Sequence, residues 1–210
     1  MGCGNIDRGS TPDCDNLPQG GTKARLVLLN YNDVESIDET ADGIITAINL
    51  VPGAVGYEFL GFRTDVKKSE GVLKTQKKNR FFHNVGFVIY EVDQAQKNNI
   101  KHITKGRFIA IVENKGQTEN SVEILGKNVG LSIVGGAVRD AYSSGGLFTI
   151  NLETPQQGGE FEKKLPQTLG FSYEESQIII DGLFNEDLWI LADGTWNDSG
   201  QWIDSALWID

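Results

Sequence analysis

Phe81-Phe-His-Asn-Val-Gly-Phe-Val-Ile-Tyr-Glu-Val92 is the stretch that decides the fold, because it is rich in β-branched and aromatic residues. Such residues favour the pleated, half-buried surface of a β-sheet, so a long strand is expected here. From Asp93 to Lys105 the pattern changes. Asp93 can cap a helix, while Ile100 and Ile103 fall near one helical face. The two segments predict a strand followed by one helix of about three turns.

Shorter apolar runs on both sides of this pair predict further strands. Turns rich in glycine separate them, and the chain has 25 glycines. The predicted strands cover residues 24–30, 43–50, 55–62, 107–113, 121–125, 128–134 and 146–154, with a short turn or helical piece at 138–142. About eight strands and one helix predict a mainly β fold, a β-sandwich or barrel with one flanking α-helix.

The remaining segments predict the domain organisation. Residues 63–80 form a polar stretch with many lysines, here called the polar arm, and are predicted as a loop or extended arm. Residues 1–23 are polar and glycine-rich and are predicted as a flexible N-terminal arm. The β domain is then expected to cover residues 24–154, and residues 155–210 a linker followed by a C-terminal segment.

Charge is divided unevenly along the chain. The 210 residues include 19 Lys and Arg against 29 Asp and Glu, a net charge of −10. From Gly61 to Arg107, however, 11 basic residues stand against 4 acidic ones, whereas Asn151 to Asp210 holds 12 acids and two lysines. An acidic chain does not suit a protein that grips nucleic acid. The two patches either set the register between copies of a subunit or are solvated faces that never meet.

All four tryptophans lie in the C-terminal tail, defined here as residues 185–210. They are Trp189, Trp196, Trp202 and Trp208. The last three recur every six residues, each two positions before an aspartate, which makes a small internal repeat. Aromatic anchors of this kind dominate protein interfaces. The tail is therefore expected to dock on its own domain, on a neighbouring subunit or on a carbohydrate.

The sequence lacks the motifs of common enzymes. It contains no glycine-rich dinucleotide or phosphate loop and no Gly-x-Ser-x-Gly nucleophile elbow. His83 and His102 have no Cys, Asp or Glu at a spacing typical of a catalytic triad or metal site, so structural or surface roles are expected. Catalysis, a cofactor and a metal are therefore not expected. No apolar run has the length of a membrane helix, and no membrane partner is expected either.

The order of elements from Phe82 to Glu153 carries a family resemblance. A strand and a helix precede three segments: Lys105-Gly-Arg-Phe-Ile-Ala-Ile-Val-Glu-Asn114, Glu123-Ile-Leu-Gly-Lys-Asn-Val-Gly-Leu131 and Gly145-Gly-Leu-Phe-Thr-Ile-Asn-Leu152. With the Met1-Gly-Cys-Gly-Asn5 opening and the tryptophan-aspartate ending, this pattern resembles virion structural proteins of bacteriophages that infect Bacteroidota. Among these it most resembles the tail tube class.

The resemblance implies a subunit that joins its sheets to copies of itself in a ring, usually a hexamer. Rings of this class stack into a tube in the virion tail, with other tail proteins as partners, after synthesis in the cytoplasm of the bacterial host. DNA passes through without specific binding, and an acidic wall suits this because it repels phosphate. Stacking uses an extended loop and the termini, so basic side chains of the polar arm are candidate contacts between rings: Lys67, Lys68, Lys74, Lys77, Lys78 and Arg80.

The C-terminal tail departs from a minimal tube subunit. Two alternatives follow from this departure. The chain can be a neck or connector ring protein of the same virion, or a surface carbohydrate-binding module that uses the tail tryptophans.

Overall fold

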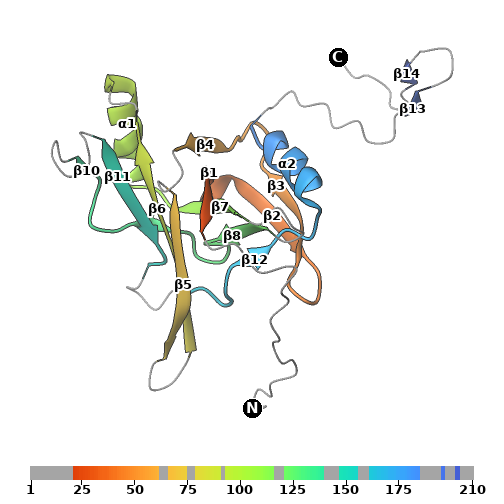
Figure 1. Ribbon diagram of the computed structural model, residues 1–210, viewed down its shortest axis with the longest axis horizontal. Helices are drawn as coiled ribbons and strands as arrows, with labels where there is room; N and C mark the ends of the chain where they lie inside the picture. The colour runs from red at the N-terminus through yellow and green to blue at the C-terminus, as the bar shows by residue number, and fades with distance from the viewer. Residues whose placement is uncertain are drawn as a thin grey trace.

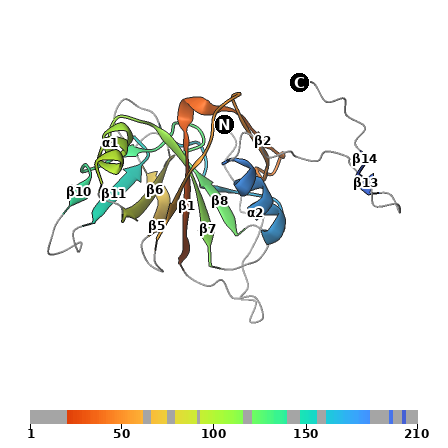
Figure 2. The same cartoon turned by 90° about the horizontal axis from the view of Figure 1, so that it is seen from above.

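The computed structural model describes residues 21–61, 66–74, 79–90, 93–115, 121–139, 147–155 and 161–184, and the pairs 195–196 and 202–203. Within them, two antiparallel sheets of five strands each pack face to face, and a third layer covers the free face of one sheet. Figure 2 shows the three layers in succession, with β1, β7 and β8 in the middle. The predicted class, a mainly β sandwich with a flanking helix, is confirmed.

The central strands of the middle sheet are buried on both faces. The order of this sheet is β12 (Gln167–Thr168), β8 (Val122–Leu125), β7 (Phe108–Asn114), β1 (Thr22–Asn30) and β4 (Tyr57–Leu60). In β1, Leu26 and Leu28 pack into the core on one face. Val27 and Leu29 pack into the core on the opposite face. A strand segment covered on both sides has no solvent-facing positions, which is why Leu26–Leu29 of β1 and Phe108–Val112 of β7 are continuous apolar runs.

The second sheet covers one face of the middle sheet. Its order is β10 (Val138–Arg139), β11 (Phe148–Glu153), β6 (Asn79–Ile89) and β5 (Lys67–Lys74), and β9 (Ser132–Ile133) also pairs with β11. Val85, Phe87 and Ile89 alternate along β6 into the core between the sheets. The ring centroid of Phe87 lies 4.9 Å from that of Phe59 in β4. Burial of an aromatic side chain such as Phe87, 1% exposed, is worth about 1.5–3 kcal/mol.

The third layer covers the other face of the middle sheet. It consists of the hairpin β2 (Val34–Glu39) and β3 (Ile45–Leu50), preceded by a 3-10 turn at Tyr31–Asp33, and of the helix α2 (Tyr173–Gly182). The hairpin turn requires Gly43, whose φ of 84° lies in the left-handed region that glycine tolerates. At the start of α2, Ser172 and Glu175 form a capping box. Ile180 then anchors the helix in the core, fully buried.

The helix α1 (Gln94–Ile103) flanks the second sheet, as Figures 1 and 2 show. Its predicted cap is confirmed, because the Asp93 carboxylate accepts a hydrogen bond of 2.7 Å from the backbone N–H of Gln96. Ile100 and Ile103 are its two buried residues and pack into the core between the sheets. The face predicted from the sequence is therefore the face that is buried.

The predicted strands at 24–30, 43–50, 55–62, 81–92, 107–113, 121–125 and 146–154 are confirmed as β1, β3, β4, β6, β7, β8 and β11. The strand predicted at 128–134 is wrong in its first half. Gly126 and Gly130 have φ of 78° and 73° and hold a turn there, so the pairing with β11 is limited to Ser132–Ile133. The turn or helical piece predicted at 138–142 is wrong at its start, because Val138–Arg139 pairs with β11 as β10.

The polar arm and the region after residue 154 also differ from expectation. Of the two alternatives for 63–80, a loop or an extended arm, the loop is wrong for Lys67–Lys74, which is a strand paired with β6. The prediction of a single helix is likewise wrong, because the structure contains a second helix, α2. The packed domain continues past the predicted boundary at residue 154, since β12 extends the middle sheet and α2 completes a core. Of the predicted N-terminal arm, 1–23, residues 1–20 lie outside the described residues, and β1 already begins at Thr22.

Candidate functional site

The hairpin of β5 and β6 is the first candidate site. The two strands pair without interruption from Lys67 opposite Gly86 to Lys74 opposite Asn79. On its other side, β6 pairs with β11 only from Asn84 to Ile89. Past β11, the backbone N–H of Thr154 donates to the carbonyl oxygen of His83, and Phe81 forms an antiparallel bridge with Glu162. Among the described residues, the hairpin therefore continues as a two-stranded ribbon only near Asn79 and Arg80, opposite Leu73 and Lys74. Figure 1 shows this ribbon extending away from the sandwich.

The predicted arm residues are spread over this hairpin. Lys67 is exposed, opposite Gly86. Lys68 points to the other face of β5 and forms an ion pair with Glu123 of β8, so it joins the two sheets of its own chain. Lys74 lies at the end of β5 and Arg80 near the start of β6. The other two candidates, Lys77 and Lys78, lie outside the described residues.

The outward face of the second sheet is the second candidate site. Pairs across β6 and β11 alternate between the core and solvent, with Asn84 opposite Glu153 and Gly86 opposite Asn151 on the outward side. Asn151 is exposed, and Asn84 and Thr149 are half-buried. Lys67, opposite Gly86, also belongs to this face. Among the side chains that the structure describes, the centre of the face is polar and carries one base, Lys67, and one acid, Glu153. Such a face does not bind phosphate groups as a lysine-rich surface does.

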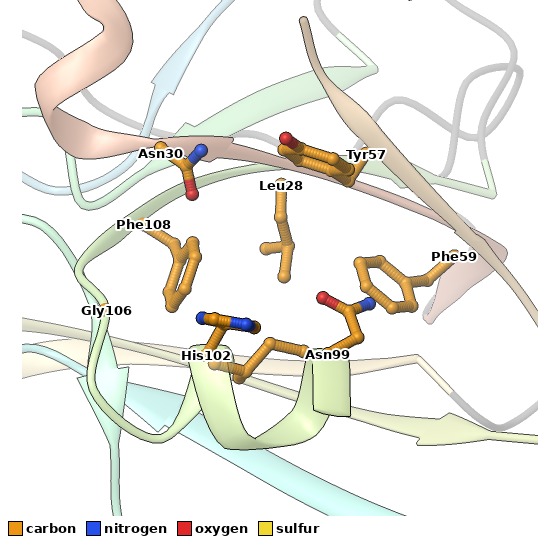
Figure 3. Close-up of a pocket in the computed structure, with 9 residues that line it drawn as sticks. Leu28, Asn30, Tyr57, Phe59, Asn99, His102, Gly106 and Phe108 are labelled. Carbon is orange, nitrogen blue, oxygen red and sulfur yellow. The ribbon is translucent and has the colours of Figure 1, made fainter. Parts of the chain in front are cut away.

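A pocket beside the strand β4 is the third candidate site (Figure 3). Its volume is about 350 Å³, at the low end of the range of about 300–1,000 Å³ for ligand pockets. Tyr57 and Phe59 of β4 face His102 and Asn99 of α1 across it, and Figure 3 shows Leu28 between them. The remaining lining residues are Asn30, Ile103, Gly106 and Phe108. The pocket combines aromatic walls with amide and imidazole groups.

Polar side chains bind α2 to the face of the middle sheet opposite to this pocket. The Arg25 guanidinium donates to Glu58 at 2.6 Å and to Asp181 and Gln177 of α2 at 2.5 Å each. Burial opposes the charged form of Arg25, but the hydrogen bonds with Asp181 and Glu58 outweigh it and raise the pKa of the guanidinium. The backbone N–H of Gly56 also donates to the carbonyl oxygen of Leu183 at 2.6 Å. The end of α2 is thus attached to the residue that precedes β4.

Two further clusters attach the segment 161–169 to the fold. The Glu39 carboxylate accepts hydrogen bonds from Lys127, Gln167 and Lys164, which lower its pKa to about 2. His83 is 2% exposed; its Nδ1 accepts from the backbone N–H of Gly126, and its Nε2 donates to the carbonyl oxygen of Lys164, each at 3.0 Å. His83 is therefore a structural residue, as expected for a lone histidine in a strand.

The tail tryptophans are only partly described. Thr195–Trp196 and Trp202–Ile203 form the short strands β13 and β14, which pair antiparallel with Trp196 opposite Trp202. The structure thus brings these two predicted residues together in one hairpin. Trp189 and Trp208 lie outside the described residues.

Comparisons with protein-family models, with curated proteins and with solved structures found no match for this chain. Within the described ranges, no group of three or more His, Cys, Asp or Glu side chains is placed to hold a metal ion. In the same residues, no helix has the length and apolar character needed to cross a membrane.

Sequence reasoning missed the pocket beside β4. Its lining comes from β1, β4, α1 and β7, which are up to 80 residues apart in the chain, from Leu28 to Phe108. The alternation of Tyr57 and Phe59 was the one local signal, because alternating aromatics on a strand share one face. Nothing in the sequence placed His102 and Asn99 opposite them.

Proposed function

We propose that this chain is a structural subunit of a bacteriophage tail that assembles into rings, and that the rings stack into a tube through which DNA passes. The observation that carries the proposal is the second sheet. It has one polar outward face, a terminal strand at β5, and a hairpin that continues beyond the neighbouring strand. A sheet of this kind can pair with copies of itself and leave a polar face toward a central channel.

The hairpin of β5 and β6 supports a role in stacking. A two-stranded ribbon that leaves the body of a subunit can reach the next ring, and its residues include Lys74, Lys77, Lys78 and Arg80. The rest of the chain is strongly acidic, so a basic ribbon meets a complementary surface on the neighbouring copy. Lys68 is excluded from this contact set because it pairs with Glu123 of its own chain.

The same features support the proposed passage of DNA. The net charge of −10 disfavours tight phosphate binding. The described centre of the outward face presents amide and hydroxyl groups from Asn84, Thr149 and Asn151. DNA next to such a wall meets few cations that hold it in place, and can slide.

The proposal is tested by the assembly state of the purified full chain. Negative-stain electron microscopy and mass photometry are expected to show rings and tubes. A protein that stays a monomer at high concentration in every salt tested contradicts the proposal. Rings that never stack favour the alternative of a neck or connector protein of the virion.

Charge reversal tests the stacking role of the hairpin. Lys74, Lys77 and Lys78 are changed together to Glu, which is expected to block tube growth while the free energy of unfolding in urea stays within about 0.5 kcal/mol of the original. Salt of about 1 M is expected to weaken the repulsion, because the Debye length falls to about 3 Å.

The matched control changes three exposed lysines on separate elements to Glu: Lys97, Lys115 and Lys163. It alters the net charge equally and is expected to assemble into tubes. If the hairpin variant forms tubes as readily as this control, the hairpin does not stack the rings.

A further inference from the structure

The edge of the middle sheet at β4 is open among the described residues. β4 is the last strand of that sheet and pairs with β1. It exposes Tyr57 to 46% and Leu60 to 65%. Exposed apolar edge strands invite pairing with other chains, and proteins commonly cover them with a loop, helix or tail. The pocket beside β4 adjoins this edge and shares Tyr57 with it.

The C-terminal tail begins beside this same edge. The carbonyl oxygen of Leu183, at the end of α2, accepts the hydrogen bond from Gly56, and Gly56 precedes Tyr57 directly. The chain therefore leaves the sandwich at the β4 edge, on the face of the middle sheet opposite to the pocket, with 26 residues still to follow. An extended chain spans up to about 3.5 Å per residue, so Trp189, five residues after Phe184, can reach about 17 Å from the exit point. Every tail tryptophan is within chain reach of the pocket.

Charge makes the tail and the pocket complementary. The tail contains six Asp or Glu and no Lys, Arg or His. The helix wall of the pocket has the opposite character, because no acidic residue occurs from Gln94 to Val112. His102 lines the pocket, and the exposed Lys101 and Lys105 lie close to it in sequence. Opposite charges within one Debye length, about 8–10 Å at physiological salt, attract each other.

The shape and polarity of the pocket suit an indole ring. The aromatic and aliphatic walls offer apolar contact, and a buried tryptophan N–H normally needs a hydrogen-bond acceptor. The side-chain amides of Asn30 and Asn99 supply such acceptors within the lining. In the repeat, an aspartate follows each of three tryptophans by two residues, about 6.6 Å in an extended chain. A seated indole therefore places a carboxylate near the basic helix.

We infer that the pocket beside β4 is the docking site for the tryptophan-aspartate tail of the same chain, with one indole between β4 and α1. The same copy is the occupant because its tail starts at the sheet edge that the pocket adjoins, and tethering gives it a high effective concentration over the tail of any neighbour. Docking covers Tyr57 and the open edge of β4. This inference does not rest on the proposed tail-tube function, since it concerns a single subunit.

Photo-crosslinking tests the occupant directly. Tyr57 is replaced by p-benzoylphenylalanine in the full chain, and equal amounts of protein with ¹⁴N and ¹⁵N are mixed before irradiation. Mass spectrometry is expected to find crosslinks from position 57 to residues 185–210, with both peptides from the same isotope. The same photo-group at Val134, an exposed residue at the far sheet, serves as the control and is expected to give no tail crosslink.

The possible outcomes separate the alternatives. Crosslinks between ¹⁴N and ¹⁵N peptides show that a neighbouring copy supplies the tail, which overturns docking within one chain. Absence of tail crosslinks at Tyr57 overturns the pocket as the docking site. Tubes seen by microscopy without tail crosslinks leave the proposed function standing, whereas crosslinks in a strict monomer support the tail inference and contradict the function.

Tryptophan fluorescence provides an independent readout, because all four tryptophans lie in the tail. Changing His102 to Glu at the pocket wall is expected to shift the emission to the red, raise acrylamide quenching and lower the tail crosslink yield roughly tenfold, since like charges in an interface are strongly unfavourable. Lys163→Glu, an exposed charge reversal away from the pocket, is the control and is expected to change none of these three quantities. Equal spectra for the two variants contradict the inference.

Discussion

Replacing His83 with Phe tests whether one imidazole holds two distant segments on the sandwich. The ring lies on β6 and is 2% exposed. Its Nδ1 accepts from the backbone N–H of Gly126, and its Nε2 donates to the carbonyl oxygen of Lys164. This fixes the neutral tautomer with the proton on Nε2. A phenyl ring has a similar size but neither nitrogen, so both backbone groups lose this partner.

The cost follows from those two hydrogen bonds. A buried donor or acceptor left without a partner costs about 1–3 kcal/mol, which applies in full to the buried N–H of Gly126. The bond to the carbonyl oxygen of the exposed Lys164 is part-buried, so its loss adds a smaller cost. Most domains have a free energy of unfolding of about 5–15 kcal/mol. We therefore expect His83→Phe to remove a substantial part of the stability of this domain.

Urea denaturation, monitored by far-UV circular dichroism, measures the effect. Circular dichroism is chosen because all four tryptophans lie in the tail, so their fluorescence does not report on this core. The midpoint is expected to fall with an unchanged denaturant slope. His102→Phe is the matched control, since the second histidine of the chain is exposed, and it is expected to change the stability by less than about 0.5 kcal/mol. If the two variants have the same small effect, the bridging role of His83 is refuted.

Two further predictions concern the pH dependence and the core. The folded state lowers the pKa of Glu39 from 4.5 to about 2, through hydrogen bonds from Lys127 and then Gln167 and Lys164. The resulting stabilisation is present above pH 4.5 and lost as the pH falls toward 2, so thermal melts of Glu39→Gln in this window are expected to depend less on pH than those of the original chain. Phe87→Ala, which empties the centre of the sandwich, is expected to cost about 3–5 kcal/mol in urea denaturation, and a cost under about 1 kcal/mol contradicts the packing described.

Local patterns identified the elements whose side chains face a core in a regular way. The run at 81–92 and the helix with Ile100 and Ile103 were predictable because packing and capping leave a direct trace in residue type. The strand β5 left no such trace. Its residues Lys67–Lys74 are mostly polar, and it exists because the neighbouring strand β6 supplies backbone partners along its length.

The helix α2 and the segment before it illustrate the same limit. Glu162 sits in a linker-like sequence, yet it is 3% exposed and accepts hydrogen bonds from the backbone N–H groups of Asn128 and Val129. The apolar run at 178–180 is too short to distinguish a strand from a helix by its period. Its helical state follows from the capping box at Ser172 and from the core position of Ile180.

The sequence by itself determined the mainly β class, the flanking helix with its cap, the uneven charge and the tryptophan repeat. Each of these depends on residue type and spacing along a few positions, which local physics can interpret. Only the tertiary structure decided that the central strands of the middle sheet are buried on both faces, that the polar arm is a hairpin and that Lys68 pairs with Glu123. The pocket beside β4 is of the same kind. It arises where strands and a helix far apart in the chain meet, and such contacts depend on how whole elements pack, which no local pattern encodes.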